Sequence, residues 1–118
     1  MTSVGLNESA TVTLDASGNG TASVGPSGQG ETWTPAYVHV KTNQAASAIA
    51  SEAQCIVYTG PQATDQYYAD GTLSGSTGDT TDVVGAYQLG KGDYVWAKWV
   101  GGDPGAEGIV RVTGTKDI

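Results

Sequence analysis

The chain has 118 residues, of which 38% are hydrophobic, 14% are charged and 18 are glycine. This composition favours one domain of short β-strands joined by tight turns over long helices. Its formal net charge is −7, and the five Lys and Arg residues are scattered. Binding to a phosphate backbone or an anionic membrane surface needs clustered basic side chains. We therefore expect neither a nucleic-acid nor a membrane partner.

The first nine residues, Met1–Ser9, contain neither a basic segment nor an apolar core. They predict no signal peptide and no membrane span. We therefore expect the chain to be made in the cytoplasm, exported without a Sec signal, or released as part of a larger assembly. We interpret residues 1–9 as an N-terminal arm that pairs with a neighbouring chain, and residues 10–118 as the folded domain.

Turn residues divide the domain into short extended segments. ASGNG after Asp15, PSGQG after Gly25, Asp70–Gly71 and Gly90–Asp93 all contain residues that tolerate tight turns. The segment from Asn43 to Glu52 has no apolar stripe at helical spacing and is interpreted as a loop or a loose hairpin, with at most one helical turn. Alternating, strand-like segments lie between these turns, at residues 10–15, 21–24, 31–43, 53–60, 83–89, 91–100 and 109–115.

Turn signals that recur every 8–12 residues or so are typical of an all-β sandwich or barrel. We therefore predict an all-β fold: a single antiparallel β-sandwich, jelly-roll-like or Ig-like, with about seven to nine short strands.

The segment ETWTPAYVHVKTN contains a proline inside an alternating pattern. Strict alternation places Trp33, Pro35 and Tyr37 on one face of the strand, and predicts that Val38 and Val40 on the other face belong to the core. Because proline cannot donate to a ladder of hydrogen bonds, Pro35 indicates a sheet edge or a β-bulge.

The segment KGDYVWAKWV holds two of the three tryptophans, one on each face of the predicted strand. In a sandwich, one face of a strand meets the core and the other meets solvent or a partner. One interpretation is that one of Trp96 and Trp99 fills the core while the other packs under a loop. The alternatives are that the outer ring lies in an assembly interface or stacks on a sugar.

Residues with catalytic or metal-binding chemistry are few. His39 is the only histidine, and no G-x-S-x-G elbow accompanies it, so we expect a protein that is not an enzyme. The single cysteine, Cys55, lies among apolar neighbours and predicts a small buried side chain without a disulfide. No cofactor is predicted; a structural calcium ion is a minor alternative, with Asp79 and Asp82 as its ligands.

The aromatic side chains are all Trp and Tyr, with no Phe. Rings that carry a polar group favour surfaces that are half-buried or become buried on association. The candidate interface or ligand-binding residues are Trp33, Tyr37, Tyr67, Tyr68, Trp96 and Trp99.

Three segments carry a resemblance to a known family: ETWTPAYVHVKT, AQCIVYTGP and YQLGKGDYVWAKWVGGDPGAEGIVRVTGT. With them, the stretch from Ala10 to Thr115 resembles the small β-sandwich virion proteins of tailed phages that infect actinobacteria. The resemblance implies a capsid decoration or minor tail subunit, made in the bacterial host cytoplasm and located in the virion. It implies no catalytic residues.

We therefore expect a non-enzymatic structural protein whose partners are other copies of itself and other virion proteins. The alternative from the aromatic side chains is a carbohydrate-binding module that recognises a host-surface or cell-wall glycan.

Overall fold

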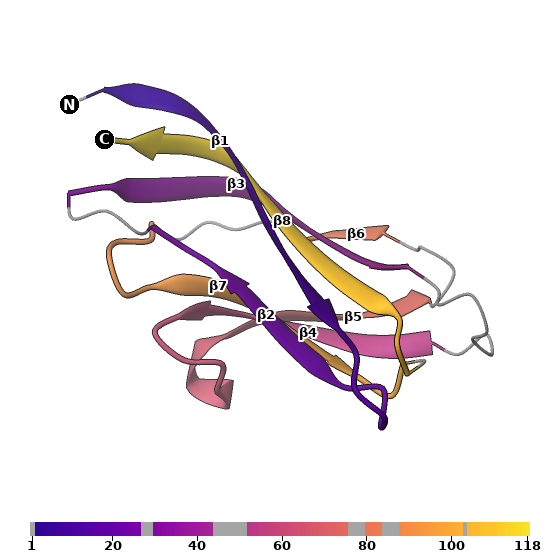
Figure 1. The fold of residues 1–118 in the computed structure, drawn as a ribbon. Helices are drawn as coiled ribbons and strands as arrows, with labels where there is room; N and C mark the ends of the chain where they lie inside the picture. The colour runs from indigo at the N-terminus through magenta and orange to yellow at the C-terminus, as the bar shows by residue number, and fades with distance from the viewer. Residues whose placement is uncertain (1, 27–29, 44–51, 76–79, 84–87, 103) are drawn as a thin grey trace.

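The computed structural model describes residues 2–26, 30–43, 52–75, 80–83, 88–102 and 104–118, and these form two antiparallel four-stranded sheets packed face to face (Figure 1). This confirms the predicted all-β sandwich. The described strands, with one short 3₁₀ helix, are β1 (Ser3–Thr13), β2 (Gly20–Val24), β3 (Thr32–Asn43), β4 (Glu52–Gly60), η1 (Asp65–Tyr67), β5 (Tyr68–Gly75), β6 (Thr80–Val83), β7 (Tyr94–Val100) and β8 (Glu107–Asp117).

The strand pairing is nested. One sheet has the order β1-β8-β3-β6 and the other β2-β7-β4-β5. The first strand therefore pairs with the eighth, the second with the seventh, the third with the sixth and the fourth with the fifth. This is the arrangement obtained when one long hairpin is rolled into two layers, which is the jelly roll. Of the two sandwich types expected, the structure has the jelly-roll order.

Strand β1 begins much earlier than the sequence pattern indicated. Every residue from Ser3 to Thr13 is paired with β8, and Leu6 is buried. The interpretation of residues 1–9 as a separate arm therefore needs correction, because Ser3–Ser9 belong to the same strand as the residues that follow them. Only Val4 and Leu6 alternate in this polar segment, so its pairing depends on the distant C-terminal strand.

The edge strand β1 carries a charged residue at a position whose alternation matches the core side. Glu8 falls on the same side of the strand as the buried Leu6, yet it is exposed, and its Oε1 lies 3.7 Å from Lys116 Nζ. A charged residue on an edge strand opposes pairing with the edge of another sheet, because the added strand would partly desolvate it.

The core lies between the two sheets and is formed by alternating residues of their inner faces. Most of these residues are small β-branched or aliphatic side chains, joined by two tryptophans. The buried cluster consists of Leu6, Leu14, Ala22, Trp33, Val38, Val40, Cys55, Val57, Leu89, Val95, Ala97, Trp99, Ala106, Val110 and Val112.

A β-bulge in β3 changes which residues face the core. Pro35 pairs with Gly114 and Tyr37 with Thr113, so Ala36 is an extra residue without a partner of its own on β8. The bulge that Pro35 predicted is confirmed. The extra residue reverses which side chains face the core on either side of the bulge, and this change of face was not predicted.

Trp33 precedes the bulge and faces the core, whereas Tyr37 follows it and faces outward. The prediction that the two share a face is therefore wrong. Val38 and Val40 are in the core, as expected.

Candidate functional site

Two of the candidate aromatic residues lie in the interior of the protein. Trp99 is 0% exposed and Trp33 is 3% exposed. Trp99 reaches from β7 to β8, where its ring lies against Gly108. Trp33 is bridged to Leu89 by two backbone hydrogen bonds of 2.8 and 2.9 Å. Both rings are enclosed by their own chain, so they are not available as interface or ligand-binding residues.

The expectation that one of Trp96 and Trp99 fills the core is confirmed for Trp99. Trp96 lies on the outer face of the sheet β2-β7-β4-β5 and is half-buried. Its indole Nε1 donates a hydrogen bond of 3.0 Å to the carbonyl oxygen of Gly60. Its ring contacts that of Tyr94 edge to face, with the ring centroids 5.4 Å apart.

A row of aromatic rings crosses this outer face. Trp96 on β7 is opposite Tyr58 on β4, which in turn is opposite Tyr68 on β5. Tyr58 and Tyr68 contact edge to face, with ring centroids 6.5 Å apart. Tyr58 is only 4% exposed although it is not part of the core between the sheets, whereas Tyr68 is 57% exposed. A fixed ring therefore supports an exposed one.

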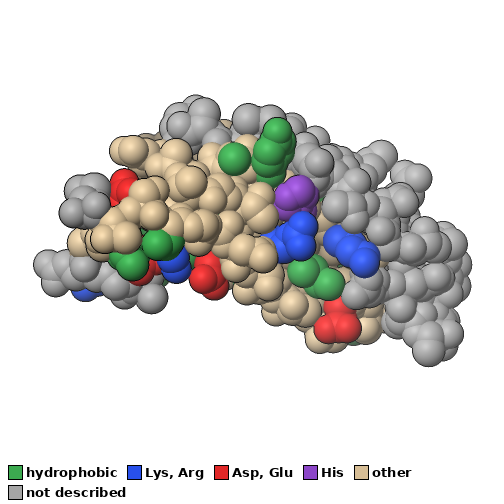
Figure 2. Space-filling model, turned by 90° about the horizontal axis from the view of Figure 1, so that it is seen from above, with side chains coloured by type: hydrophobic (Ala, Val, Ile, Leu, Met, Phe, Trp, Pro, Cys, Tyr) green, Lys and Arg blue, Asp and Glu red, His purple; other side chains and the backbone are tan. Residues whose placement is uncertain are grey.

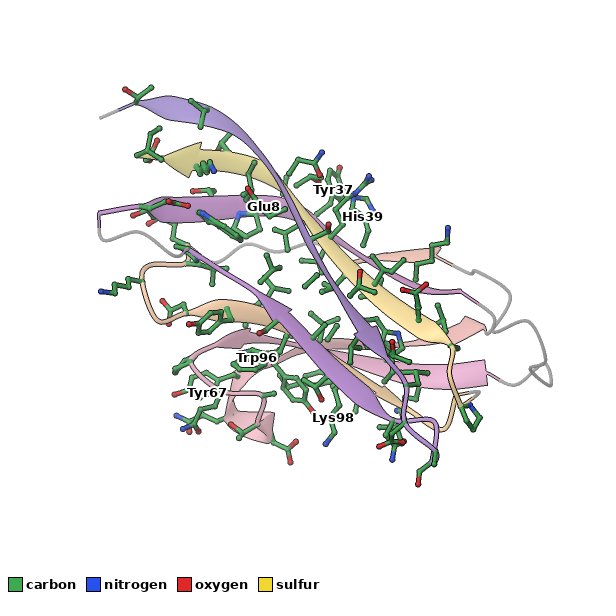
Figure 3. All side chains as sticks on the ribbon, viewed as in Figure 1. Glu8, Tyr37, His39, Tyr67, Trp96 and Lys98 are labelled. Carbon is green, nitrogen blue, oxygen red and sulfur yellow. The ribbon has the colours of Figure 1, made fainter. Side chains whose placement is uncertain are left out.

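The turn between β4 and β5 brings Tyr67 beside this row. Gly60 has φ +141°, and a Cβ at that position would lie 2.6 Å from Tyr67 Cδ1, so the ring packs directly on the glycine. A hydrogen bond of 2.8 Å from the Tyr67 backbone N–H to the Thr64 carbonyl closes the η1 turn. Figure 3 shows Tyr67 and Trp96 on the same outer side of the lower sheet.

A pocket of about 320 Å³ opens at this end of the sheet. Its walls combine two tyrosine rings with amide, hydroxyl and carboxylate groups. Asp93 Oδ2 accepts a hydrogen bond of 3.2 Å from the Gly90 backbone N–H, which fixes the carboxylate in its turn. The lining residues are Thr59, Gly60, Pro61, Gln66, Tyr67, Tyr68, Gln88, Leu89 and Asp93. We call this the tyrosine pocket.

The outer face of the other sheet has a different chemistry. A second pocket, of about 270 Å³, is lined by His39 and Lys41 of β3 and by Ile109 and Arg111 of β8. Tyr37 lies next to it and is 49% exposed, with its ring 6.2 Å from that of His39. We call these five residues the basic face. Figure 2 shows the blue side chains beside the histidine on this side of the molecule.

The basic face and the tyrosine pocket lie on opposite sides of the sandwich. Figure 3 shows Tyr37 and His39 on the upper sheet and Tyr67 and Trp96 on the lower one. His39 Nε2 lies 3.5 Å from Thr113 Oγ1. The structure therefore divides the six candidate residues into two in the core, one on the basic face and three around the tyrosine pocket.

Cys55 is buried, as expected. Its side chain is 0% exposed on the inner face of β4. Burial raises the pKa of the Cys55 thiol to about 12, because desolvation disfavours the thiolate and a hydrogen bond from the Lys98 backbone offsets only part of that effect. A thiol held neutral in the core is a poor nucleophile.

The proposed calcium ligands are not placed by the structure. Asp79 lies outside the described residues, and Asp82 lies in β6, where the structure does not describe the side chain. Elsewhere, within the described residues, no three His, Cys, Asp or Glu side chains are grouped as metal ligands would be.

The described part of the chain contains no helix with the length and apolar character needed to cross a membrane. Comparison of the chain with protein-family models, with curated proteins and with solved structures found no match.

Several residues of these two surfaces were missed by the sequence reasoning. Gln66 comes from the connection between β4 and β5, whereas Gln88 and Asp93 come from the connection between β6 and β7. Of these three, only Asp93 had a local signal, as the end of the turn Gly90–Asp93. Lys41 and Arg111 are far apart in the sequence, and the register of β3 with β8 brings them together.

Proposed function

We propose that this chain is a non-enzymatic structural protein of a phage virion, either a capsid decoration or a minor tail subunit, that acts through contacts with copies of itself and with other virion proteins. The observation that carries the proposal is the pair of exposed rings, Tyr37 at 49% and Tyr68 at 57%, on opposite outer faces of a sandwich whose core is already closed. The family resemblance adds the particle as the setting.

Exposed tyrosines are suited to such contacts. A Tyr ring contributes a large contact area with few rotatable bonds, and interface anchors are enriched in Tyr, Trp and Arg. Tyr37 lies near His39, which is paired with Arg111, so the basic face combines two of the preferred anchors.

Two different faces also suit a subunit within a repeated structure. A subunit that contacts neighbours through two unlike surfaces makes heterologous contacts, which generate rings and lattices when repeated. The basic face and the tyrosine pocket differ in charge and lie on opposite layers.

The first test is the location of the protein. Mass spectrometry of purified particles of the phage that encodes the chain should detect it at a fixed copy number relative to the major capsid protein. A chain that is found only in the lysate and never in particles contradicts the proposal.

The second test concerns the exposed rings. Particles assembled in the presence of Tyr37→Ala or Tyr68→Ala should incorporate less of the chain, while the melting temperature of each purified variant stays within about 2 °C of the parent, because exposed substitutions have small effects on stability. Thr11→Ala, an exposed substitution on β1, serves as a control that should incorporate normally. Unchanged incorporation of both Tyr variants would remove the support for these two faces.

A second candidate function is recognition of a host-surface or cell-wall glycan. The specific observation in its favour is the tyrosine pocket, in which rings and hydrogen-bonding side chains line one cavity. The chain should then sediment with insoluble cell-wall material of an actinobacterial host. If it stays in the supernatant over a range of wall concentrations, this second function is refuted.

A further inference from the structure

We infer that the tyrosine pocket binds a neutral pyranose unit, with Tyr68 as the ring on which the sugar stacks, and that Asp93 makes the pocket select neutral sugars over acidic ones. This inference rests on the second candidate function, glycan recognition, and assigns to it the residues and the class of sugar.

The first step concerns the ring. Tyr68 lines the pocket and more than half of its surface is open to solvent. The buried Tyr58 supports one side of the Tyr68 ring through an edge-to-face contact, with an interplanar angle of 83°. A ring that is exposed and already oriented loses little side-chain entropy when an apolar sugar face stacks on it.

The second step concerns the hydrogen bonds. Sugars present many hydroxyl groups, each of which can donate and accept. The pocket has side chains of both kinds, with the amides of Gln66 and Gln88, the hydroxyl of Thr59 and the carboxylate of Asp93. A few fixed polar groups among rings is the general composition of small-ligand pockets, and about 320 Å³ is within the lower part of their size range.

The third step concerns the carboxylate. Asp93 uses Oδ2 to accept the hydrogen bond from Gly90 N–H. A carboxylate has about four acceptor sites on its two oxygens, so this one hydrogen bond leaves Asp93 with acceptor capacity for a ligand hydroxyl. A charge-assisted hydrogen bond of this kind is about twice as strong as a neutral one.

The fourth step concerns charge. Among the residues that the structure describes, no Lys or Arg lines the tyrosine pocket. The chain as a whole carries a net charge of −7. A uronic acid or a sulfated sugar would bring a second negative charge close to Asp93 without a lining cation to offset it. The pocket should therefore reject acidic sugars, and this discrimination should depend on Asp93.

The experiment is a binding titration of the full chain, followed by calorimetry and by tryptophan fluorescence. The probes are neutral trisaccharides of glucose, galactose, mannose and N-acetylglucosamine, and the trimer of galacturonic acid as the acidic probe. Trp96 lies in the aromatic row next to the pocket while Trp33 and Trp99 are enclosed, so a fluorescence change reports mainly on Trp96.

Three variants decide the residue assignments. Tyr68→Ala should weaken binding of the neutral sugar at least tenfold, and Tyr37→Ala, which removes a comparably exposed tyrosine on the opposite sheet, should leave it unchanged. Asp93→Asn keeps an oxygen to accept from Gly90 but removes the charge. It should weaken binding of the neutral sugar a few-fold and should reduce the ratio of neutral to acidic affinities at least tenfold.

The outcomes separate the two levels of the proposal. If the chain sediments with host cell wall but Tyr68→Ala binds sugars as the parent does, or if the parent binds acidic and neutral probes equally, the inference is wrong and glycan recognition stands. If the chain binds neither cell wall nor any probe, glycan recognition and the inference both fail. Selective binding of a neutral probe with the expected loss in Tyr68→Ala supports both.

Discussion

Gly108 is a position where a side chain of one sheet packs directly on the backbone of the other. It lies in β8, with Val12 and Thr42 as its neighbours across the sheet, and the indole ring of Trp99 packs on it from the opposite sheet. A Cβ added at residue 108 would lie 2.7, 2.8 and 2.9 Å from three ring carbons, Cδ2, Cε3 and Cε2 of Trp99. Carbon atoms in good contact are about 3.5–4.0 Å apart, so Gly108→Ala requires a shift of roughly 1 Å.

The ring cannot shift without displacing its neighbours or entering the interior further, because no part of it borders solvent. Trp99 is 0% exposed, and its indole Nε1 is buried with no hydrogen-bond partner in the described part of the chain. Overpacking of a core commonly costs about 1–3 kcal/mol, whereas replacing glycine by alanine in a strand gains about 0.5–1 kcal/mol of backbone entropy. We expect Gly108→Ala to lower the free energy of unfolding by a net 1–2 kcal/mol or so.

The assay is urea unfolding followed by tryptophan fluorescence. The urea midpoint of Gly108→Ala should fall while the m-value stays constant. Gly5→Ala is the matched control, because nothing lies within 4 Å of a Cβ built at that exposed position of β1. It should be neutral or slightly stabilising. In a Trp99→Phe background, the smaller ring leaves room for the methyl group, so Gly108→Ala should cost at least about 1 kcal/mol less there. An equal cost in both backgrounds would refute the packing argument.

Three further predictions concern the core and its edges. The folded pKa of Cys55, about 12, exceeds the unfolded value of 9.0, so the contribution of the neutral thiol to stability is complete below pH 9 and is lost as the pH rises towards 12. In this window, urea titrations should show the parent losing up to about 1.4 kcal/mol of unfolding free energy per pH unit relative to Cys55→Ala. A difference between the two proteins that stays constant with pH would contradict the raised pKa. Gly114→Ala should lower the melting temperature strongly, because Gly114 has φ +155° opposite the bulge and a Cβ there would lie 2.7 Å from the backbone nitrogen of Ala36. A change in melting temperature of less than about 2 °C would argue against that backbone geometry. Trp99→Ala should lower the free energy of unfolding in urea by about 3–5 kcal/mol. Trp96→Ala should lower it clearly less, because Trp96 is half-buried on an outer face. Equal losses in the two variants would contradict the assignment of only one of these rings to the core.

The class of fold and the faces of β7 could be predicted because both depend on local pattern. Alternation in β7 needs no knowledge of the partner strand, and it separated Trp96 from Trp99 correctly. The face of Trp33 was wrong for an equally definite reason. One residue, Ala36, is inserted relative to β8, and Pro35 indicated that a bulge was possible without showing which residue it would insert.

The extent of β1 and the composition of the two surfaces depend on contacts between distant segments. The segment Ser3–Ser9 is polar and becomes a strand through its pairing with β8, more than 100 residues later for Ser3 and Asp117. The tyrosine pocket likewise joins Gln66 after β4 with Gln88 and Asp93 before β7. Alternation along one strand carries no information about which connections meet at the end of a sheet.

The nested order of the strands also constrains how the chain acquires its structure. The pair that forms from the nearest segments, β4 with β5, is the innermost, and each later pair must close a longer loop, up to β1 with β8. Loop closure over such separations is slow, and folds dominated by distant pairings fold slowly. Of the described strands, β1 is synthesised first and its partner β8 last, so we expect the β1–β8 pair to form last during synthesis.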